Sequence, residues 1–256
     1  MIAVEELLPW LNTVIWHGFV VFLRIAAITS MLPAFGEQSI PARVKLVIAI
    51  AFTLVVAPTQ PILEFSTGVG ALAYLTFSEV IAGLAVGIGV RLFILALQTA
   101  GSIAAQSTSL SQVLGGAAVD PLPAMGYILI VAGLALAVMN GLHVKAAHLI
   151  IISYDFLPRG VFVGASDITD WGVHRVAQAF SLAFTLAAPF VILSVLYNFA
   201  LGAINRAMPQ LMVAFVGAPV ITAGGLALLM VAAPFMLQVW IESMDRFMFD
   251  PFGAGR

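Results

Sequence analysis

The sequence predicts an all-α membrane protein, and three observations carry that prediction. The 256 residues are 62% hydrophobic and 9% charged, whereas a soluble domain has roughly 25% charged residues. The apolar residues stand in long runs and lack the alternation of a half-buried strand. Several runs approach the roughly 20 residues with which a helix crosses the hydrocarbon core of a bilayer.

Six apolar runs divide the chain and predict about six hydrophobic helices in a single integral membrane domain over residues 1–256. The second run is short for a bilayer, and prolines at 189, 219 and 234 predict kinks in the last two, so these helices need protein neighbours. The fourth run leaves open a continuation toward Leu157. The runs are Val14–Phe35, Val44–Val56, Ala71–Leu97, Met125–Asn140, Val176–Ile204 and Leu211–Ile241.

The ends and the charges give an expected orientation. Because Glu5 and Glu6 precede the first run, the N-terminus does not read as a secretory signal, and we expect the run to be retained as a helix. If all six runs cross and the N-terminus faces outside, Lys and Arg divide between both sides and do not decide the orientation. Most acidic residues would lie outside, which favours this orientation.

The charged residues inside the apolar runs could have either a structural or a functional role. Arg24 either lines a pathway or forms a structural pair inside a bundle, and the pair is favoured because an Arg so placed faces protein or water. Glu79 and Arg91 are too far apart along one helix to pair with each other, and a single Glu is a poor proton relay. Between them, Gly83 and Gly87 form a GxxxG pattern that predicts a tight helix-packing face.

The sequence offers no catalytic or metal-binding pattern. It contains no cysteine, and His143 and His148 are five residues apart, which is not the spacing that puts two ligands on one helix face. Asp167, Asp170 and His174 could share one helix face as metal ligands. The pattern is more typical of a helix start, with Ser166 as its cap and the acidic residues complementing the helix dipole. No nucleophile, zinc-protease or phosphate-loop motif occurs. We therefore expect no enzyme activity, cofactor, metal or nucleic-acid partner.

One polar segment interrupts the apolar chain between Gly101 and Met125, with Asp120 as its single formal charge. From the residues alone, an ordinary extramembrane loop is the favoured reading. The alternative is a segment lining water, since irregular backbone at membrane depth is tolerated only when it is buried in protein or faces a wet cavity. Gly115 and Gly116 supply permissive backbone conformations.

Two junctions carry more specific motifs. The first contains Phe35, Gly36, Ser39, Pro41 and Arg43 within PAFGEQSIPARVK, a Gly/Pro turn followed by basic residues that anchor the next helix. The second is NRAMPQ, a short hairpin turn. Its motif residues are Asn205, Arg206, Pro209 and Gln210.

Together, in this order and at this chain length, the two motifs resemble the FliR/SctT-like export-gate family of type III secretion, with the flagellar branch favoured. The resemblance covers essentially the whole chain. It implies helical hairpins within a hetero-oligomeric export gate in the flagellar basal body of the bacterial inner membrane. Its expected partners are FliP-like and FliQ-like membrane subunits, an FlhB-like switch protein and, transiently, unfolded flagellar export substrates. Residues 1–160 then correspond to the FliP-like part, and residues 161–256 to a FliQ-like hairpin.

The same resemblance implies that the polar segment, about residues 101–123, is a pore plug. Its composition suits a wet lumen, because it is polar without a strong charge that would trap a passing polypeptide. The residues expected to form the plug are Gln106, Ser107, Ser109, Ser111, Gln112, Gly115 and Gly116. The alternative function is a small-solute secondary transporter of the inner membrane. Transporters usually show an internal repeat and a midplane site of convergent polar groups, and the sequence displays neither.

Overall fold

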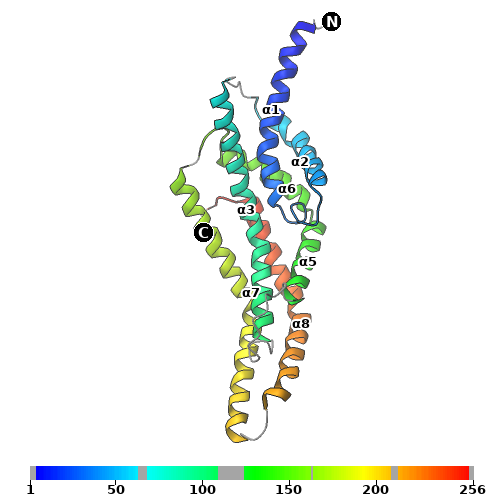
Figure 1. Cartoon of the computed structure of the whole chain (residues 1–256), viewed down its shortest axis with the longest axis vertical. Helices are drawn as coiled ribbons and strands as arrows, with labels where there is room; N and C mark the ends of the chain where they lie inside the picture. The colour runs from blue at the N-terminus through cyan, green and yellow to red at the C-terminus, as the bar shows by residue number, and fades with distance from the viewer. Residues whose placement is uncertain (1–3, 63–67, 109–123, 163, 209–212, 254–256) are drawn as a thin grey trace. The chain divides into compact units, whose positions relative to one another are not determined.

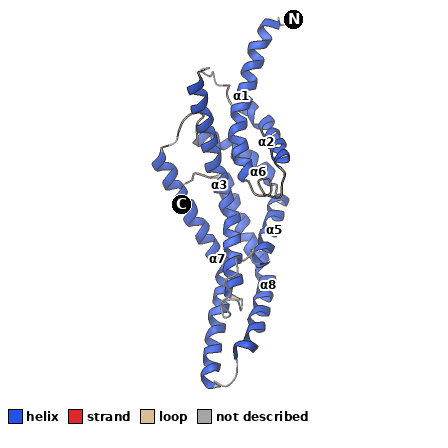
Figure 2. Cartoon of the chain, in the orientation of Figure 1, coloured by secondary structure: helices blue, strands red, loops and turns tan. Residues whose placement is uncertain are grey.

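The computed structural model describes residues 4–62, 68–108, 124–162, 164–208 and 213–253, and within them it contains helices and no strand (Figure 2). The helices follow one another in chain order as Figure 1 shows. They are α1 (Val4–Met31), α2 (Ala42–Val56), the short 3₁₀ helix η1 (Ala57–Thr59), α3 (Val69–Ser107), α5 (Ala124–Met139), α6 (Leu142–Phe156), α7 (Ala165–Ala207) and α8 (Val213–Phe249).

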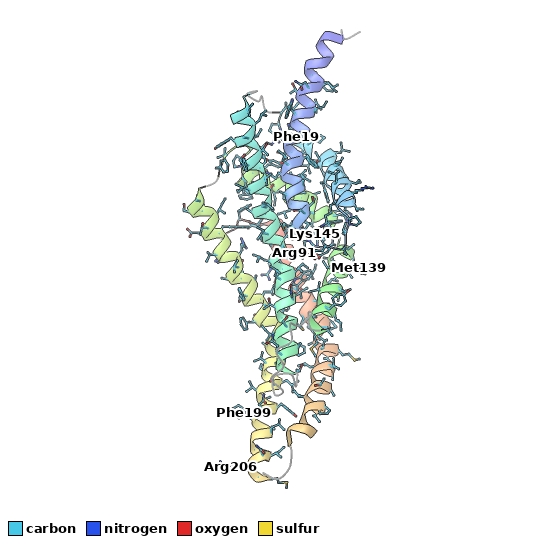
Figure 3. The ribbon with its side chains drawn as sticks, in the orientation of Figure 1. Phe19, Arg91, Met139, Lys145, Phe199 and Arg206 are labelled. Carbon is cyan, nitrogen blue, oxygen red and sulfur yellow. The ribbon has the colours of Figure 1, made fainter. Side chains whose placement is uncertain are left out.

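The prediction of an all-α membrane protein is confirmed. Five helical segments are long and apolar enough to cross a membrane, and six if the bent pair α5–α6 is one span. Many large apolar side chains on them are exposed, for example Phe199 on α7, labelled in Figure 3, whose side chain is 74% exposed. Exposed apolar surface of this extent is typical of a protein surrounded by lipid or by other subunits.

Two helices are longer than their apolar runs. α3 continues to Ser107, so residues 101–107, which we expected in the polar loop, are helical. Tertiary packing stabilises this stretch, because Ala100 and Ala104 are fully buried. α7 begins at Ala165, so Ser166 lies inside its first turn and does not precede the helix as the expected cap.

The fourth apolar run does continue toward Leu157, but as two helices. α5 and α6 are bent relative to each other by 76°. The break occurs at Gly141, whose φ of +75° lies in the left-handed region where glycine carries no Cβ penalty. In the last two runs, α7 contains Pro189 and α8 contains Pro219 and Pro234, and neither helix ends at a proline.

The chain divides into two compact units that interleave along the sequence. Unit 1 comprises residues 1–92, 138–175 and 244–256, and unit 2 comprises residues 93–137 and 176–243. The core of unit 1 contains fully buried apolar residues of α1, α3 and α6, and that of unit 2 contains fully buried apolar residues of α3, α5, α7 and α8. These residues include Val21, Ile25, Ile28, Val86, Val90, Leu149 and Ile150 in unit 1, and Leu97, Leu129, Ala187, Phe190 and Trp240 in unit 2.

Candidate functional site

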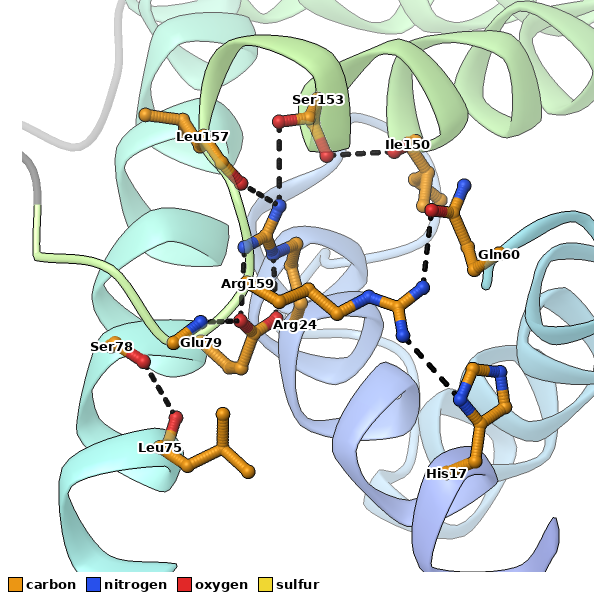
Figure 4. Close-up of polar contacts among 11 residues, drawn as sticks. His17, Arg24, Gln60, Leu75, Ser78, Glu79, Ile150, Ser153, Leu157 and Arg159 are labelled. Carbon is orange, nitrogen blue, oxygen red and sulfur yellow. Dashed lines mark hydrogen bonds and ion pairs between the residues drawn. The ribbon is translucent and has the colours of Figure 1, made fainter. Parts of the chain in front are cut away.

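A buried ion pair joins α1 and α3 inside unit 1 (Figure 4). The Nε of Arg24 donates to Oε2 of Glu79 at 2.9 Å, and its Nη2 donates to Oε1 at 3.1 Å. The two side chains are 1% and 0% exposed. This bidentate geometry matches the planar guanidinium to both carboxylate oxygens. The prediction that Arg24 forms a structural pair inside a bundle is therefore confirmed.

The same guanidinium also donates hydrogen bonds to carbonyl groups at the C-terminal end of α6. Its Nη1 donates to the carbonyl of Ser153 at 3.3 Å and to that of Leu157 at 2.8 Å. The last carbonyls of a helix have no intrahelical donor, and they carry the negative end of the helix dipole. Gly160, just beyond this helix, donates its N–H to Oε1 of Glu79 at 3.2 Å. A cation from α1 and an anion from α3 thus fix where α6 ends.

A second arginine lies beside this centre. The guanidinium carbons of Arg24 and Arg159 lie 4.0 Å and 4.9 Å from the ring centroid of Tyr154, distances that suit cation–π contact. Arg159 also donates to the carbonyl of Pro61 at 2.9 Å and to Oε1 of Gln60 at 3.1 Å. Burial lowers the pKa of Arg159 from its ordinary value. This residue ties the segment after α6 to the segment after α2.

His17 completes the cluster from α1. Its Nε2 lies 3.0 Å from the carbonyl of Ala57, and its Nδ1 lies 3.4 Å from Nη1 of Arg159. A carbonyl can only accept and a guanidinium can only donate. The arrangement therefore requires the proton on Nε2, with Nδ1 as the acceptor. The hydrogen bonds and ion pair drawn in Figure 4 join the charged side chains of this cluster to one another and to backbone carbonyls, which makes the cluster a structural centre of unit 1.

The two glycines of the GxxxG pattern lie against α1 next to this centre. A Cβ on Gly83 would lie 2.5 Å from the carbonyl oxygen of Arg24, and a Cβ on Gly87 would lie 2.9 Å from the Cβ of Met31. Both distances are shorter than real Cβ contacts. Because glycine has no Cβ, the backbones of α1 and α3 can approach closely, and this brings Glu79 within reach of Arg24.

The first junction motif forms the turn between α1 and α2. A Cβ on Gly36 would overlap the carbonyl of Ser30, so the turn requires glycine there. Nζ of Lys45 donates to the carbonyl of Gly36 at 3.0 Å. The ring of Phe35 stands edge-on to that of Phe52, with centroids 6.2 Å apart. The turn is therefore fixed at its glycine, at its aromatic ring and at the first turn of α2.

The remaining residues of this motif lie nearer the surface. Pro41 precedes α2, and its carbonyl accepts the N–H groups of the first helical turn. Ser39 and Arg43 are exposed. Arg91, labelled in Figure 3, donates from Nη1 to Oε1 of Glu37 at 2.6 Å, which ties the turn to α3. Partner contacts of the motif stay a prediction.

The second motif begins at the end of α7. Asn205 and Arg206 are exposed in the last turn of that helix, where a cation complements the helix dipole. Figure 3 labels Arg206 at this end. Pro209 and Gln210 lie outside the described residues.

Of the residues expected in the plug, Gln106 and Ser107 belong to the last turn of α3. Gln106 is exposed, and the hydroxyl of Ser107 donates to the carbonyl of Ala104 at 2.8 Å. The others lie outside the described residues, namely Ser109, Ser111, Gln112, Gly115 and Gly116.

Unit 2 surrounds this end of α3 with close helix contacts that sequence reasoning missed. A Cβ on Gly101 would overlap the backbone of Gly126, so α3 and α5 touch backbone to backbone. The indole nitrogen of Trp240 on α8 donates to the carbonyl of Phe93 at 2.8 Å, and Trp240 is fully buried. Thr108 is 2% exposed and lies against α8. In the sequence, only the isolated Trp240 within an apolar run indicated such a contact, because a buried indole N–H needs a hydrogen-bond acceptor.

Comparison with known proteins places the chain in a family. Residues 15–247 match the family model described as bacterial export proteins, family 1. The flagellar biosynthetic protein FliR of Caulobacter vibrioides is 33% identical over 232 residues, which cover 89% of this chain and 92% of that protein. FliR of Escherichia coli is 29% identical, covering 93% and 92%, and FliR of Bacillus subtilis is 29% identical, covering 86% of each chain. The chain therefore belongs to family 1 of the bacterial export proteins, the FliR family of flagellar export apparatus subunits.

Proposed function

We propose that this chain is a structural and gating subunit of the flagellar type III protein export channel in the bacterial inner membrane. The observation that carries the proposal is the match to flagellar FliR proteins over nearly the whole length of both chains. The long apolar helices support a membrane location. The partners are FliP-like and FliQ-like membrane subunits and an FlhB-like switch protein, and unfolded flagellar substrates pass through the assembly.

The exposed surface of unit 2 supports an assembled state. Large apolar side chains along α7 are exposed at helical spacing, at Val176, Phe180, Phe184, Val195 and Phe199. A stripe of this kind is buried either by lipid or by a neighbouring helix. In the proposed function, neighbouring membrane subunits cover part of it.

The ends of segment 109–123 support a plug role for that segment. Thr108 directly precedes the segment, and Met125 is the second residue after it. The Oγ1 of Thr108 lies 4.0 Å from Sδ of Met125, so the described residues on either side of the segment lie close together. A polar segment held at both ends suits a closure that yields to a passing polypeptide and returns.

The plug is tested by deleting residues 109–119, which spares the helical residues Gln106 and Ser107. The complex should assemble with unchanged native mass, and cells carrying it should leak ions and small solutes that the wild-type complex retains. A replacement of the same residues by a Gly/Ser stretch of equal length is the control for loop length. An intact barrier in the assembled deletion variant would remove the plug from the proposed function.

The second motif is proposed to contact the FlhB-like switch protein. Met208, just beyond α7, is 57% exposed, and the chain has no cysteine of its own. A cysteine at this position should crosslink to the switch protein in intact cells, whereas one at exposed Phe162 in unit 1 serves as the comparison. Absence of any crosslink from position 208 would count against this contact.

The assembly itself is tested by the native mass of the tagged chain, extracted gently from its own membranes. The proposal expects a large complex with several copies of other small membrane proteins. A lone chain or a simple homodimer, reproducible across detergents, would reject the export-channel proposal in favour of the secondary transporter.

A further inference from the structure

The imidazole of His17 is held in a position that accepts one ring proton and not two. Its side chain is 5% exposed. Nε2 lies 3.0 Å from the carbonyl of Ala57, and Nδ1 lies 3.4 Å from Nη1 of Arg159 (Figure 4). An imidazolium carries an N–H on both nitrogens, and a guanidinium offers no acceptor. A second proton on His17 therefore replaces a hydrogen bond by two donors, and two cations, facing each other.

The charges around His17 also oppose a second proton. Glu79 on α3 neutralises Arg24 on α1 through their bidentate ion pair, so the positive charge of Arg159 is left over. Tyr154 on α6 lies between the two guanidinium groups and contributes a neutral phenol. Asp155, in the last turn of α6, is exposed.

The side of the cluster formed by α2 and η1 brings no carboxylate to His17. The residues that follow α2 there, 57–60, do not titrate, and the two basic residues of α2, Arg43 and Lys45, stand in its first turn, at the other end of the helix. A protonated His17 would thus add its charge to a cluster that already carries excess positive charge.

Arg159 is the side chain that can give way. It is partly exposed and long, whereas His17 is buried and belongs to the body of α1. Arg159 also donates to the carbonyl of Pro61 at 2.9 Å and to Oε1 of Gln60 at 3.1 Å. When its guanidinium leaves the imidazolium, both of these bonds are strained or lost. They are the bonds that join the segment after α6 to the segment after α2.

We propose that His17 and Arg159 form an acid-sensitive tie inside unit 1, closed while His17 is neutral and opened when His17 takes up a proton. The tie joins α1, the segment after α2 and the segment after α6. It is a property of unit 1 and does not depend on the export function.

The sign of the pH dependence follows from the hydrogen bonds. Histidine in an unfolded chain takes up its proton as the pH falls through about 6.5, and the closed tie excludes that proton. Below this range the unfolded state binds more protons, so the contribution of the tie is present above it and is lost as the pH falls.

The first measurement is the thermal midpoint of the full chain in one detergent, at about pH 7.5 and about pH 5.5. His17→Gln is the test variant, because an amide supplies both a donor for Ala57 and an acceptor for Arg159 but does not titrate. The fall in midpoint on acidification should be about 3–5 °C larger for the wild type than for His17→Gln. Exposed His143 provides the control, and His143→Gln should fall as the wild type does. Equal falls for the wild type and His17→Gln would overturn the proposal.

Arg159→Met distinguishes the tie from burial of the histidine alone. It leaves His17 in place and removes the cation that faces Nδ1, so at least about half of the acid-dependent fall that His17 contributes should disappear. An unchanged dependence on pH in Arg159→Met would overturn the tie. This variant also keeps the proposal testable should His17→Gln fail to fold.

Opening is measured at Arg159 itself, by the rate at which trypsin cleaves the folded full chain after this residue. Each rate is divided by that of His17→Gln at the same pH, which cancels the pH dependence of the protease. The ratio should be near unity at about pH 7.5 and at least about twofold higher at about pH 6. A ratio that stays the same at both pH values would show that Arg159 is not released, and would overturn the proposal.

Discussion

We expect the substitution of Arg24 to cause the largest loss of stability among the variants considered below. Arg24→Met introduces an apolar side chain of similar length but leaves the carboxylate of Glu79 buried, with the N–H of Gly160 as its donor among the described residues. It also strips the carbonyls of Ser153 and Leu157 of the donor that α1 provides. One uncompensated charge and the carbonyl of Leu157 without this donor then lie inside unit 1, whereas the carbonyl of Ser153 keeps the backbone N–H of Leu157 at 2.9 Å.

The magnitude follows from this burial. Leaving one partner of a buried ion pair alone costs about 3–5 kcal/mol. The pair of Arg91 and Glu37 is the internal comparison, because its side chains are 30% and 23% exposed and such pairs contribute about 0.2–1 kcal/mol. At roughly 2–4 °C of melting temperature per kcal/mol for chains near this size, Arg24→Met should lower the midpoint by about 6–20 °C. Arg91→Met should lower it by at most about 4 °C.

The assay is thermal unfolding of the purified chain in one detergent, followed by far-ultraviolet circular dichroism. The double variant Arg24→Met with Glu79→Leu should recover part of the loss, since it removes the lone carboxylate. Full recovery is not expected, because the carbonyl of Leu157 at the end of α6 still lacks the donor that Arg24 provides. Equal midpoints for Arg24→Met and Arg91→Met would refute the reasoning.

Three further substitutions test other parts of the fold by the same thermal assay. Gly36→Ala places a Cβ on a backbone carbonyl of α1 and should destabilise by about 1–3 kcal/mol, whereas Gly18→Ala, with open space at its Cβ, should not destabilise. Trp240→Phe removes a buried indole donor to α3 and should cost about 1–3 kcal/mol; the exposed Trp16→Phe is its control, and equal effects would contradict the bond. Lys145→Met breaks a partly exposed pair between α6 and α8 and should cost only about 1 kcal/mol, so a loss above that of Arg24→Met would contradict the ranking.

The helices could be predicted from the sequence because long apolar runs leave few alternatives. The two units could not, because no composition change marks their boundaries and several helices contribute to both. The partner of Arg24 was also hidden, since Glu79 is 55 residues away and only the approach of α1 to α3 joins them. The GxxxG pattern of Gly83 and Gly87, which permits this approach, could be recognised in the sequence. The sequence did not show that these glycines face α1.

The polar end of α3 shows where local propensity misleads. Gln106, Ser107 and Thr108 resemble a loop, because Ser and Thr compete with the helical backbone for hydrogen bonds. In the structure, the hydroxyls of Ser107 and Thr108 bond to carbonyls of the preceding turn of α3. Burial against α8 then extends the helix past its apolar run. Only the packing of a helix more than 100 residues later in the chain decides this, as the bond from Thr222 illustrates.

The distance in sequence between Arg24 and Glu79 also bears on biosynthesis. A ribosome adding about 5–20 residues per second makes the arginine roughly 3–11 s before its carboxylate partner, given their separation of 55 residues. The carbonyls that the guanidinium also binds are made later still. During that interval the nascent α1 carries an unneutralised cation inside an apolar segment. The N-terminal helices therefore reach their final state only when α3 and α6 have left the ribosome, and a chain arrested after α2 would be held in the membrane by its surroundings and not by its own core.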